Sequence, residues 1–182
     1  MTAYTPGYRQ LARELEESVR AHGLPFLGFP YESRGSWLAN LRIKPEVLLA
    51  ALWGRSSAVW IDADAVLRGP PVLFDELERE GAEVAFHVLR KVREPLGGTI
   101  WTASRAFLRS WLAIIDSPTY TAELDQVSLP EAVERSGARF RELPREYCWL
   151  DYFTHPRWGG PGEPVVEHKQ ASRAVRRGEM TP

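Results

Sequence analysis

The chain has 182 residues, of which 44% are hydrophobic and 26% are charged, and its formal net charge is −1. This composition predicts one soluble domain with enough length for a core. The near-neutral charge gives no indication of binding to nucleic acid or to an anionic membrane. The single cysteine, Cys148, excludes an internal disulfide framework and a cysteine-rich zinc site and favours a reducing, cytoplasmic compartment. No apolar run is long enough to cross a bilayer.

The first part of the chain is expected to alternate strands with helices. Leu11, Leu15 and Val19 recur at helical spacing, with charged residues between them. Pro45 is tolerated in the first turn of a helix and is expected to begin one. In order, the sequence predicts a strand over residues 1–5, a helix over 8–22, a strand over 24–29, a loop over 30–41 and a helix over 45–53.

A short apolar run, Ala58 to Ile61, is followed directly by Asp62-Ala63-Asp64. The run suits a buried strand and is too short for a helix. If the strand continues through Asp64, both carboxylates point the same way, since residues two apart share a face of a strand. Two carboxylates held that close repel one another, and the usual remedy is a divalent cation such as Mg²⁺ or Mn²⁺. The alternative is that Asp62 caps a turn and Asp64 faces water, but open α/β sheets place their ligands just after a buried strand.

The second part of the chain continues the alternation. Ser104 suits the N-cap of a helix, and Asp125 could cap a further one. The predicted elements are a helix over residues 72–79, a strand over 83–88, an irregular charged stretch over 89–96, a strand over 99–102, helices over 105–116 and 126–136, and strands over 139–143, 147–150 and 164–168. Alternating strands and helices predict an α/β fold with a largely parallel sheet. We expect a single domain over residues 1–182, with a flexible tail at 174–182.

Several short motifs follow one another in order along nearly the whole chain. They are Trp37-Leu38-Ala39-Asn40 with Lys44-Pro45, Val59-Trp60-Ile61-Asp62-Ala63-Asp64, Gly97-Gly98-Thr99, Asp125-Gln126, Leu143-Pro144 with Tyr147-Cys148, and His168-Lys169-Gln170-Ala171-Ser172-Arg173. Together they resemble the nucleotide-diphospho-sugar transferases, which are GT-A-fold glycosyltransferases related to glycogenin and the galactosyltransferase-type enzymes. The resemblance implies a compact GT-A-type (Rossmann-like) domain with a mixed, mostly parallel sheet flanked by helices.

The resemblance also implies a metal site. Asp62 and Asp64 match the family's D-x-D motif, whose carboxylates bind Mn²⁺ or Mg²⁺ against the diphosphate of the donor. His168 lies where the family supplies a further ligand, and neutral imidazole is a reasonable ligand for Mn²⁺. Without the resemblance, His168 is more simply a residue at the end of a strand.

The remaining site residues are likewise implied by the resemblance. Lys169 and Arg173 are expected to contact the diphosphate, although both could belong to a solvated basic tail. Lys44 is expected near the nucleotide or its phosphates, and a surface lysine is the alternative. Tyr4 and Thr5 end the first predicted strand, where the family binds the nucleoside, and Tyr4 could instead pack in the core.

Two motifs are expected near the sugar. Gly97, Gly98 and Thr99 would let the backbone approach the donor sugar closely, and an ordinary glycine turn is the alternative. Asp125 and Gln126 match the family's sugar-side pair, in which the carboxylate could bind hydroxyl groups or act as a general base toward the acceptor. Asp125 could also be a helix N-cap, and the two roles are compatible.

The sequence therefore predicts a metal-dependent glycosyltransferase that uses a nucleotide-diphosphate sugar, with UDP-sugars favoured, and an unknown acceptor. A non-catalytic nucleotide-sugar-binding domain is the first alternative. A phosphatase of the haloacid-dehalogenase type is the second, because its first motif also places two aspartates after a buried strand. That enzyme class needs a second acidic pair downstream, and Asp116, Asp125 and Asp151 each stand alone.

Overall fold

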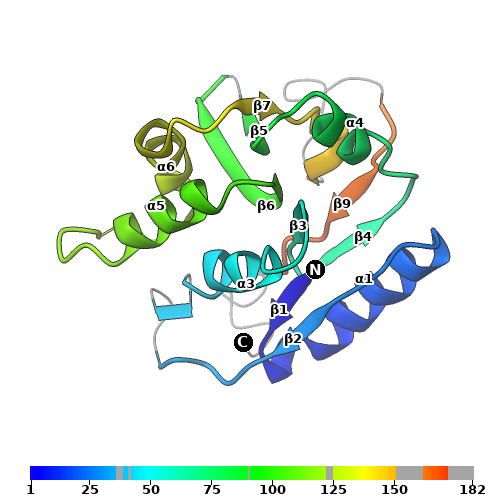
Figure 1. Ribbon diagram of the computed structural model, residues 1–182. Coiled ribbons are helices and arrows are strands. Elements are labelled where there is room, and N and C mark those ends of the chain that lie inside the picture. Colours follow the sequence, from blue (N-terminus) through cyan, green and yellow to red (C-terminus); the bar gives the residue numbers. More distant parts are fainter. Residues whose placement is uncertain (36–38, 41, 90, 122–124, 151–161, 172–182) are drawn as a thin grey trace. The chain divides into compact units, whose positions relative to one another are not determined.

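The computed structural model describes residues 1–35, 39–40, 42–89, 91–121, 125–150 and 162–171. The chain divides into two compact units, whose helices and strands are labelled in Figure 1. The first unit comprises Met1–Glu32, Ile61–Pro71 and Pro144–Pro182, and the second comprises Ser33–Trp60 and Val72–Leu143. The expected tail at residues 174–182 lies outside the described residues, and the single-domain organisation remains a prediction.

The first unit contains two small sheets and one long helix. Its elements are β1 (Thr2–Tyr4), the 3-10 helix η1 (Pro6–Tyr8), α1 (Arg9–Ala21), β2 (Gly28–Pro30), β4 (Ala65–Leu67), the 3-10 helix η3 (Arg145–Cys148), β8 (Trp149–Leu150) and β9 (Val166–His168). Strand β1 pairs with β2 in parallel. Strand β9 lies between β4, to which it is antiparallel, and β8, to which it is parallel.

Helix α1 forms because its apolar residues recur at the spacing that one helical face requires. That face buries Ala12, Leu15 and Val19. The hydroxyl of Ser18 donates to the carbonyl of Leu15 at 2.7 Å and accepts from the backbone N–H of Leu67 at 3.0 Å. Ser18 therefore fixes β4 against α1, and the two elements run side by side in Figure 1.

The second unit is built on a four-stranded sheet with the order β3-β6-β5-β7. Strand β5 is antiparallel to β6 and parallel to β7. The elements are α3 (Ile43–Ala51), β3 (Ala58–Ile61, whose last residue belongs to the first unit), α4 (Leu73–Arg79), β5 (Val84–Leu89), β6 (Glu94–Thr102), α5 (Arg105–Ile115), the 3-10 helix η2 (Asp125–Ser128), α6 (Leu129–Ser136) and β7 (Phe140–Glu142).

Helix α5 supplies several of the largest buried side chains of this unit's core. Its buried residues include Phe107, Leu108 and Trp111. The hydroxyl of Ser104 caps the helix by accepting from the backbone N–H of Phe107 at 3.2 Å, as the sequence predicts. The indole N–H of Trp111 donates to the hydroxyl of Ser128 at 2.8 Å, which ties α5 to the end of η2.

The mixed α/β class is confirmed, with parallel pairs β1–β2, β5–β7 and β8–β9 and antiparallel pairs β4–β9 and β5–β6. Several boundaries differ from the prediction. Strand β3 begins at Ala58, ends at Ile61 and does not continue through Asp64. The strand expected over residues 24–29 is β2 at 28–30.

Other differences arise where local signals compete with pairing. The stretch 89–96, expected to be irregular, contains the start of β6 at Glu94, because that strand pairs with β5. Pro45 lies third in α3 rather than first. The helix expected over 126–136 is divided into η2 and α6, and the strand expected over 147–150 is the end of η3 followed by β8.

Candidate functional site

In the first unit, a turn presents the two aspartates of the D-x-D motif. Strand β3 ends at Ile61, and the backbone N–H of Ala65 donates to the carbonyl of Asp62 at 3.0 Å. This bond closes a turn over residues 62–65, after which β4 begins. The two carboxylates are therefore brought together by the turn and not by strand alternation, which corrects the reason given by the sequence pattern.

The same turn is fastened to the end of β9. The register of β4 and β9 places Ala65 opposite His168. The carbonyl of Asp64 accepts from the backbone N–H of Lys169 at 3.0 Å, and its Oδ2 accepts from that of Ala171 at 2.7 Å. The Nδ1 atom of His168 lies 3.9 Å from Oδ1 of Asp64. Two segments about a hundred residues apart in the sequence thus meet at one point.

The structure brings together all three residues predicted to bind a metal. One ligand atom from each of Asp62, Asp64 and His168 lies within 4.8 Å of the others. The side chains of Asp64 and His168 are only 12% and 4% exposed. Two hard carboxylates with one imidazole are a donor set that suits Mn²⁺, and Mg²⁺ with additional water, so the residues fit the cation that the sequence predicts.

The charges in this cluster stabilise one another. Burial by itself would raise the pKa of Asp64, but His168 and the backbone N–H of Ala171 outweigh it and hold the pKa below its ordinary value. Burial would lower the pKa of His168, but Cys148 and the carboxylates of Asp64 and Asp62 outweigh it and raise the pKa to about 10. Without a cation, the imidazole therefore carries a proton that a bound metal would have to displace.

Tyr8 is a neighbour of the cluster that sequence reasoning missed. It ends η1 and is half-buried. Burial and the negative charges of Asp64 and Asp62 raise the pKa of its phenol to about 12, with Tyr31 contributing less. The phenol therefore stays protonated and can donate a hydrogen bond. An aromatic residue close after the first strand is the only signal that the sequence offers for it.

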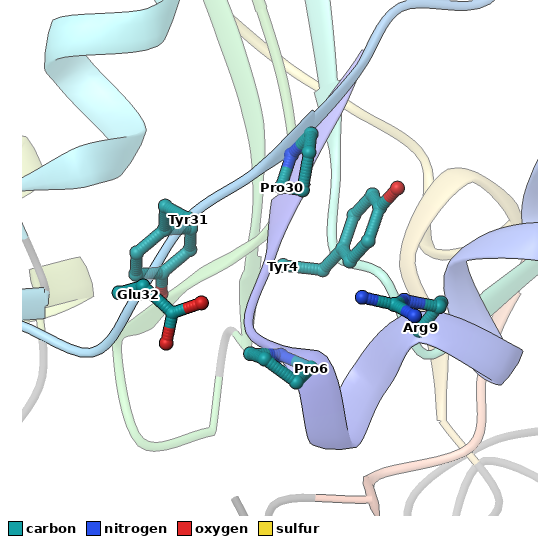
Figure 2. Close-up of a pocket in the computed structure, with 6 residues that line it drawn as sticks. All are labelled: Tyr4, Pro6, Arg9, Pro30, Tyr31 and Glu32. Carbon is teal, nitrogen blue, oxygen red and sulfur yellow. The ribbon is translucent and has the colours of Figure 1, made fainter.

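Beside β1 and β2 lies a pocket of about 150 Å³ (Figure 2). Figure 2 shows Tyr4 and Arg9 on one side of the view and Tyr31 and Glu32 on the other. The lining residues are Tyr4, Pro6, Arg9, Pro30, Tyr31 and Glu32. Of the two residues predicted to face the nucleoside, Tyr4 lines this pocket. The other, Thr5, is buried, and its hydroxyl has no hydrogen-bond partner within the described part of the chain.

Of the two basic residues predicted to contact the diphosphate, the structure describes only Lys169. Lys169 follows the metal-ligand candidate His168 directly, and its ammonium group pairs with the carboxylate of Glu14 on α1. That pairing lowers the pKa of Glu14. Arg173 lies outside the described residues, so its predicted role has no structural counterpart.

In the second unit, the motif Gly97-Gly98-Thr99 forms an irregularity in β6. Leu96 pairs with His87 of β5, whereas Ile100 pairs with the preceding residue, Phe86. Residues 97–99 therefore have no partner in β5. Glycine is common in such bulges because the backbone must bend there and close approach is possible. The alternative of an ordinary glycine turn is wrong, because all three residues lie within a strand.

Two side chains satisfy the backbone of Gly97, the first residue of this bulge. The ammonium group of Lys44 donates to the carbonyl of Gly97 at 2.8 Å, and the N–H of Gly97 donates to Oε1 of Gln126 at 3.3 Å. The Nε2 atom of Gln126 donates to the carboxylate of Glu94 at 2.8 Å. Lys44 is buried, and its ammonium group also lies 5.4 Å from the ring centroid of Trp60.

The structure thus joins three of the predicted residues, Lys44, Gly97 and Gln126, in one network. It adds Glu94, which sequence reasoning assigned to an irregular stretch. Thr99 is fully buried. Asp125 begins η2 rather than preceding a helix as an N-cap.

The mixed α/β fold and the Asp62-Asp64-His168 cluster both fit the GT-A glycosyltransferase fold. Comparison with solved structures confirms that this chain has that fold. It superimposes on a glycosyltransferase involved in the glycosylation of the major capsid of PBCV-1 with a TM-score of 0.72 and 16% identity, over 98% of this chain and 97% of that one.

Two further structures show the same fold. The galactosyltransferase LgtC, in complex with donor and acceptor sugar analogues, matches with a TM-score of 0.64 and 10% identity, over 100% of this chain and 95% of that one. The glycosyltransferase GlyE of Streptococcus pneumoniae matches with a TM-score of 0.64 and 12% identity, over 100% of this chain and 64% of that one. No protein-family model and no curated protein matches the sequence. Within the described residues, no helix has the length and apolar character needed to cross a membrane.

Proposed function

We propose that the protein is a metal-dependent glycosyltransferase that transfers a sugar from a nucleotide-diphosphate donor to an acceptor. The observation that carries the proposal is the convergence of Asp62, Asp64 and His168 on one point in a glycosyltransferase fold. A bound divalent cation would neutralise charge on the departing nucleoside diphosphate. UDP-sugars are the favoured donors, and Mn²⁺ is the favoured cation.

The chain's own residues have distinct roles in this proposal. In the first unit, the pocket beside Tyr4 would hold the nucleoside, since an aromatic face and the nearby cation Arg9 suit a base and its ribose. Thr5, whose buried hydroxyl has no hydrogen-bond partner among the described residues, would lie beside the nucleoside. Lys169 would contact the diphosphate, in exchange for part of its contact with Glu14.

In the second unit, the bulge at Gly97, Gly98 and Thr99 would lie against the sugar, held in shape by Lys44 and Gln126. Transfer breaks the bond from the sugar's C1 to the diphosphate oxygen and forms one from C1 to an acceptor oxygen. The proton of the acceptor hydroxyl must go to a base, and Asp125 is the proposed base, with Gln126 beside it.

A thermal-shift panel tests this function. UDP, GDP, ADP and CDP and their common sugar conjugates are each added with Mn²⁺ and, in parallel, with EDTA. A ligand at 100 times its dissociation constant stabilises the folded state by about 2.7 kcal/mol. We expect a shift with one nucleotide that disappears with EDTA. Absence of any shift would overturn the proposed function.

A second measurement distinguishes an enzyme from a non-catalytic binding domain. Release of nucleoside diphosphate from the sugar conjugate that binds is followed over hours with Mn²⁺, because water can replace the acceptor slowly. Release above the uncatalysed rate supports the enzyme. Metal-dependent binding without any release, even with candidate acceptors added, would favour the binding domain.

A further inference from the structure

We propose that Glu94 is a positioning residue that fixes the side-chain amide of Gln126 in a single orientation. The inference rests on the proposed function, in which Gln126 lies beside the reacting sugar. Glu94 is the first residue of β6, and its carboxylate accepts from Nε2 of Gln126 at 2.8 Å. Glu94 matches none of the motifs on which the expected site was built.

The chemistry of the partners specifies which end of the amide is which. A glutamine amide can usually be turned over with little change in shape, because its oxygen and nitrogen are nearly equal in size. Here, the backbone N–H of Gly97 can only donate, so it requires Oε1. The carboxylate of Glu94 can only accept when ionised, so it requires Nε2. The two contacts agree, and either partner opposes the turned-over amide.

The orientation determines what Gln126 can offer to a ligand. An amide has two N–H donors and two acceptor lone pairs. Gly97 uses one lone pair and Glu94 uses one N–H, so within the described part of the chain one of each remains. A sugar hydroxyl both donates and accepts, and the remaining pair suits it. If the carboxylate of Glu94 is lost, the described residues hold the amide by one 3.3 Å bond only, and this arrangement is no longer fixed.

The test uses three variants of the full chain, Glu94→Ala, Glu94→Gln and Glu94→Asp, with Glu134→Gln as the matched control. Glu134 is an exposed carboxylate on α6 in the same unit. A neutral glutamine at position 94 can present its own oxygen to Nε2, so it should restore much of what alanine removes. Aspartate keeps the charge but is one methylene too short for the same contact.

The first readout is the NMR signal of the two Nε2 protons of Gln126, assigned by its loss in Gln126→Glu. The proton bound to a carboxylate should resonate well away from its partner in the parent. We expect the two signals to converge in Glu94→Ala, to remain separated in Glu94→Gln, and to be unchanged in Glu134→Gln. Unchanged signals in Glu94→Ala would overturn the positioning role. This readout needs no activity.

The second readout is release of nucleoside diphosphate from UDP-galactose, UDP-glucose and GDP-mannose with Mn²⁺. We expect Glu94→Ala to lower kcat by about 10- to 100-fold, since small misplacements of a site residue have effects of that size. KM for the donor should change by less than about threefold, because the proposed metal and nucleotide contacts do not include Gln126. A general structural defect would instead lower the folded fraction and would not be restored by glutamine.

Each combination of results has a meaning. Converged NMR signals with an unchanged kcat would overturn the role of Glu94 in transfer. Absence of turnover by the parent with the sugar conjugate that it binds in the thermal-shift panel would overturn the proposed transfer activity, and with it the catalytic consequence. In that event, the NMR comparison still decides whether Glu94 positions the amide, so the two failures can be told apart.

Discussion

The candidate site residues of the two units differ in what their side chains contact. In the first unit, Asp62, Asp64 and His168 direct their ligand atoms at one another, and two of the three carry negative charge. In the second unit, the side chains of Lys44 and Gln126 form hydrogen bonds with the backbone of Gly97. The first arrangement concentrates charge and so favours an external cation. The second satisfies a bulged backbone and so favours a defined shape.

This difference teaches that a carboxylate can be suited to binding a cation in one place and to holding a neighbouring side chain in another. Two carboxylates beside one protonated imidazole leave a net negative charge, and a divalent cation that displaces the imidazole proton would balance it. A carboxylate beside an amide, as in Glu94 and Gln126, is already satisfied. Mutations in the first unit should therefore change ligand affinity, whereas mutations in the second should change stability or turnover.

The largest expected effect is at Asp62. Asp62→Asn removes one charged ligand without removing the hydrogen bond that the backbone N–H of Ala171 donates to Asp64 and that fastens the turn. Donor affinity in Mn²⁺ should fall more than about 100-fold, since changes to groups that only support metal ligands already cost 10- to 100-fold. Calorimetric titration of the binding nucleotide with Mn²⁺ measures the loss.

The matched control for this variant is Glu17→Gln, which neutralises an exposed carboxylate on α1 in the same unit. Both variants should unfold within about 2–4 °C of the parent without metal, which corresponds to less than about 1 kcal/mol. Donor affinity that Asp62→Asn leaves intact would refute the metal assignment and remove the contrast between the units.

The next effect is the pH dependence of stability and of metal affinity that His168 gives to the first unit. The pKa of His168 is raised from 6.5 to about 10 in the folded chain. Protonation of His168 therefore stabilises the metal-free fold fully below about pH 6.5, and that contribution is lost as the pH rises toward 10. Metal binding shows the opposite trend, since the ligand must lose its proton, so affinity for Mn²⁺ should increase over the same range.

Urea unfolding in EDTA from pH 6 to pH 10 measures the first trend, and Mn²⁺ titration in the same buffers measures the second. His168→Asn should flatten the unfolding trend, because the group that titrates is absent. A parent whose stability in EDTA rises over this range would contradict the assigned charge of His168. Above the ordinary pKa of an aspartate, the lowered pKa of Asp64 contributes a constant stabilisation, which is lost only at lower pH.

A smaller effect is expected in the core of the second unit. Ser128→Ala leaves the buried indole N–H of Trp111 without its partner at 2.8 Å. The free energy of unfolding should fall by about 1–3 kcal/mol, the usual cost of an unsatisfied buried donor. Urea unfolding measures it, with the exposed Ser56→Ala as the control.

Donor affinity should remain within about twofold of the parent in Ser128→Ala, a change of less than about 0.5 kcal/mol. Trp111→Phe in the Ser128→Ala background should cost less than the sum of the two single changes, because neither partner is then left unpaired. Additive costs would show that the bond contributes nothing.

The smallest effect is expected at Lys169. If Lys169 contacts the diphosphate, Lys169→Met should weaken donor binding by about tenfold, or about 1.4 kcal/mol. Glu14→Gln removes its partner on α1 and should leave donor binding unchanged or strengthen it. Calorimetry on both variants compares them directly. Equal and unchanged affinities would identify Lys169 as part of a surface ion pair only.

The sequence determined what local chemistry alone can specify. The recurrence of Leu15 and Val19 defined the buried face of α1, and Ser104 defined the start of α5. Composition and alternating periodicity defined the mixed α/β class. The type and order of Asp62, Asp64 and His168 indicated a hard-cation site, because their ligand chemistry is a property of the residues themselves. These features depend on neighbours within a few positions.

Only the tertiary structure decided how distant segments meet. The register of β4 and β9 brings His168 to Asp64, and a turn rather than a continuous strand brings Asp62 to the same point. Likewise, the pairing of β5 with β6 extended a charged stretch into a strand and produced the bulge that Gly97 occupies. Strand pairing is a long-range choice, because a segment's partner sets its hydrogen bonds and register. No local pattern records that partner, so Glu94 entered the site only through the fold.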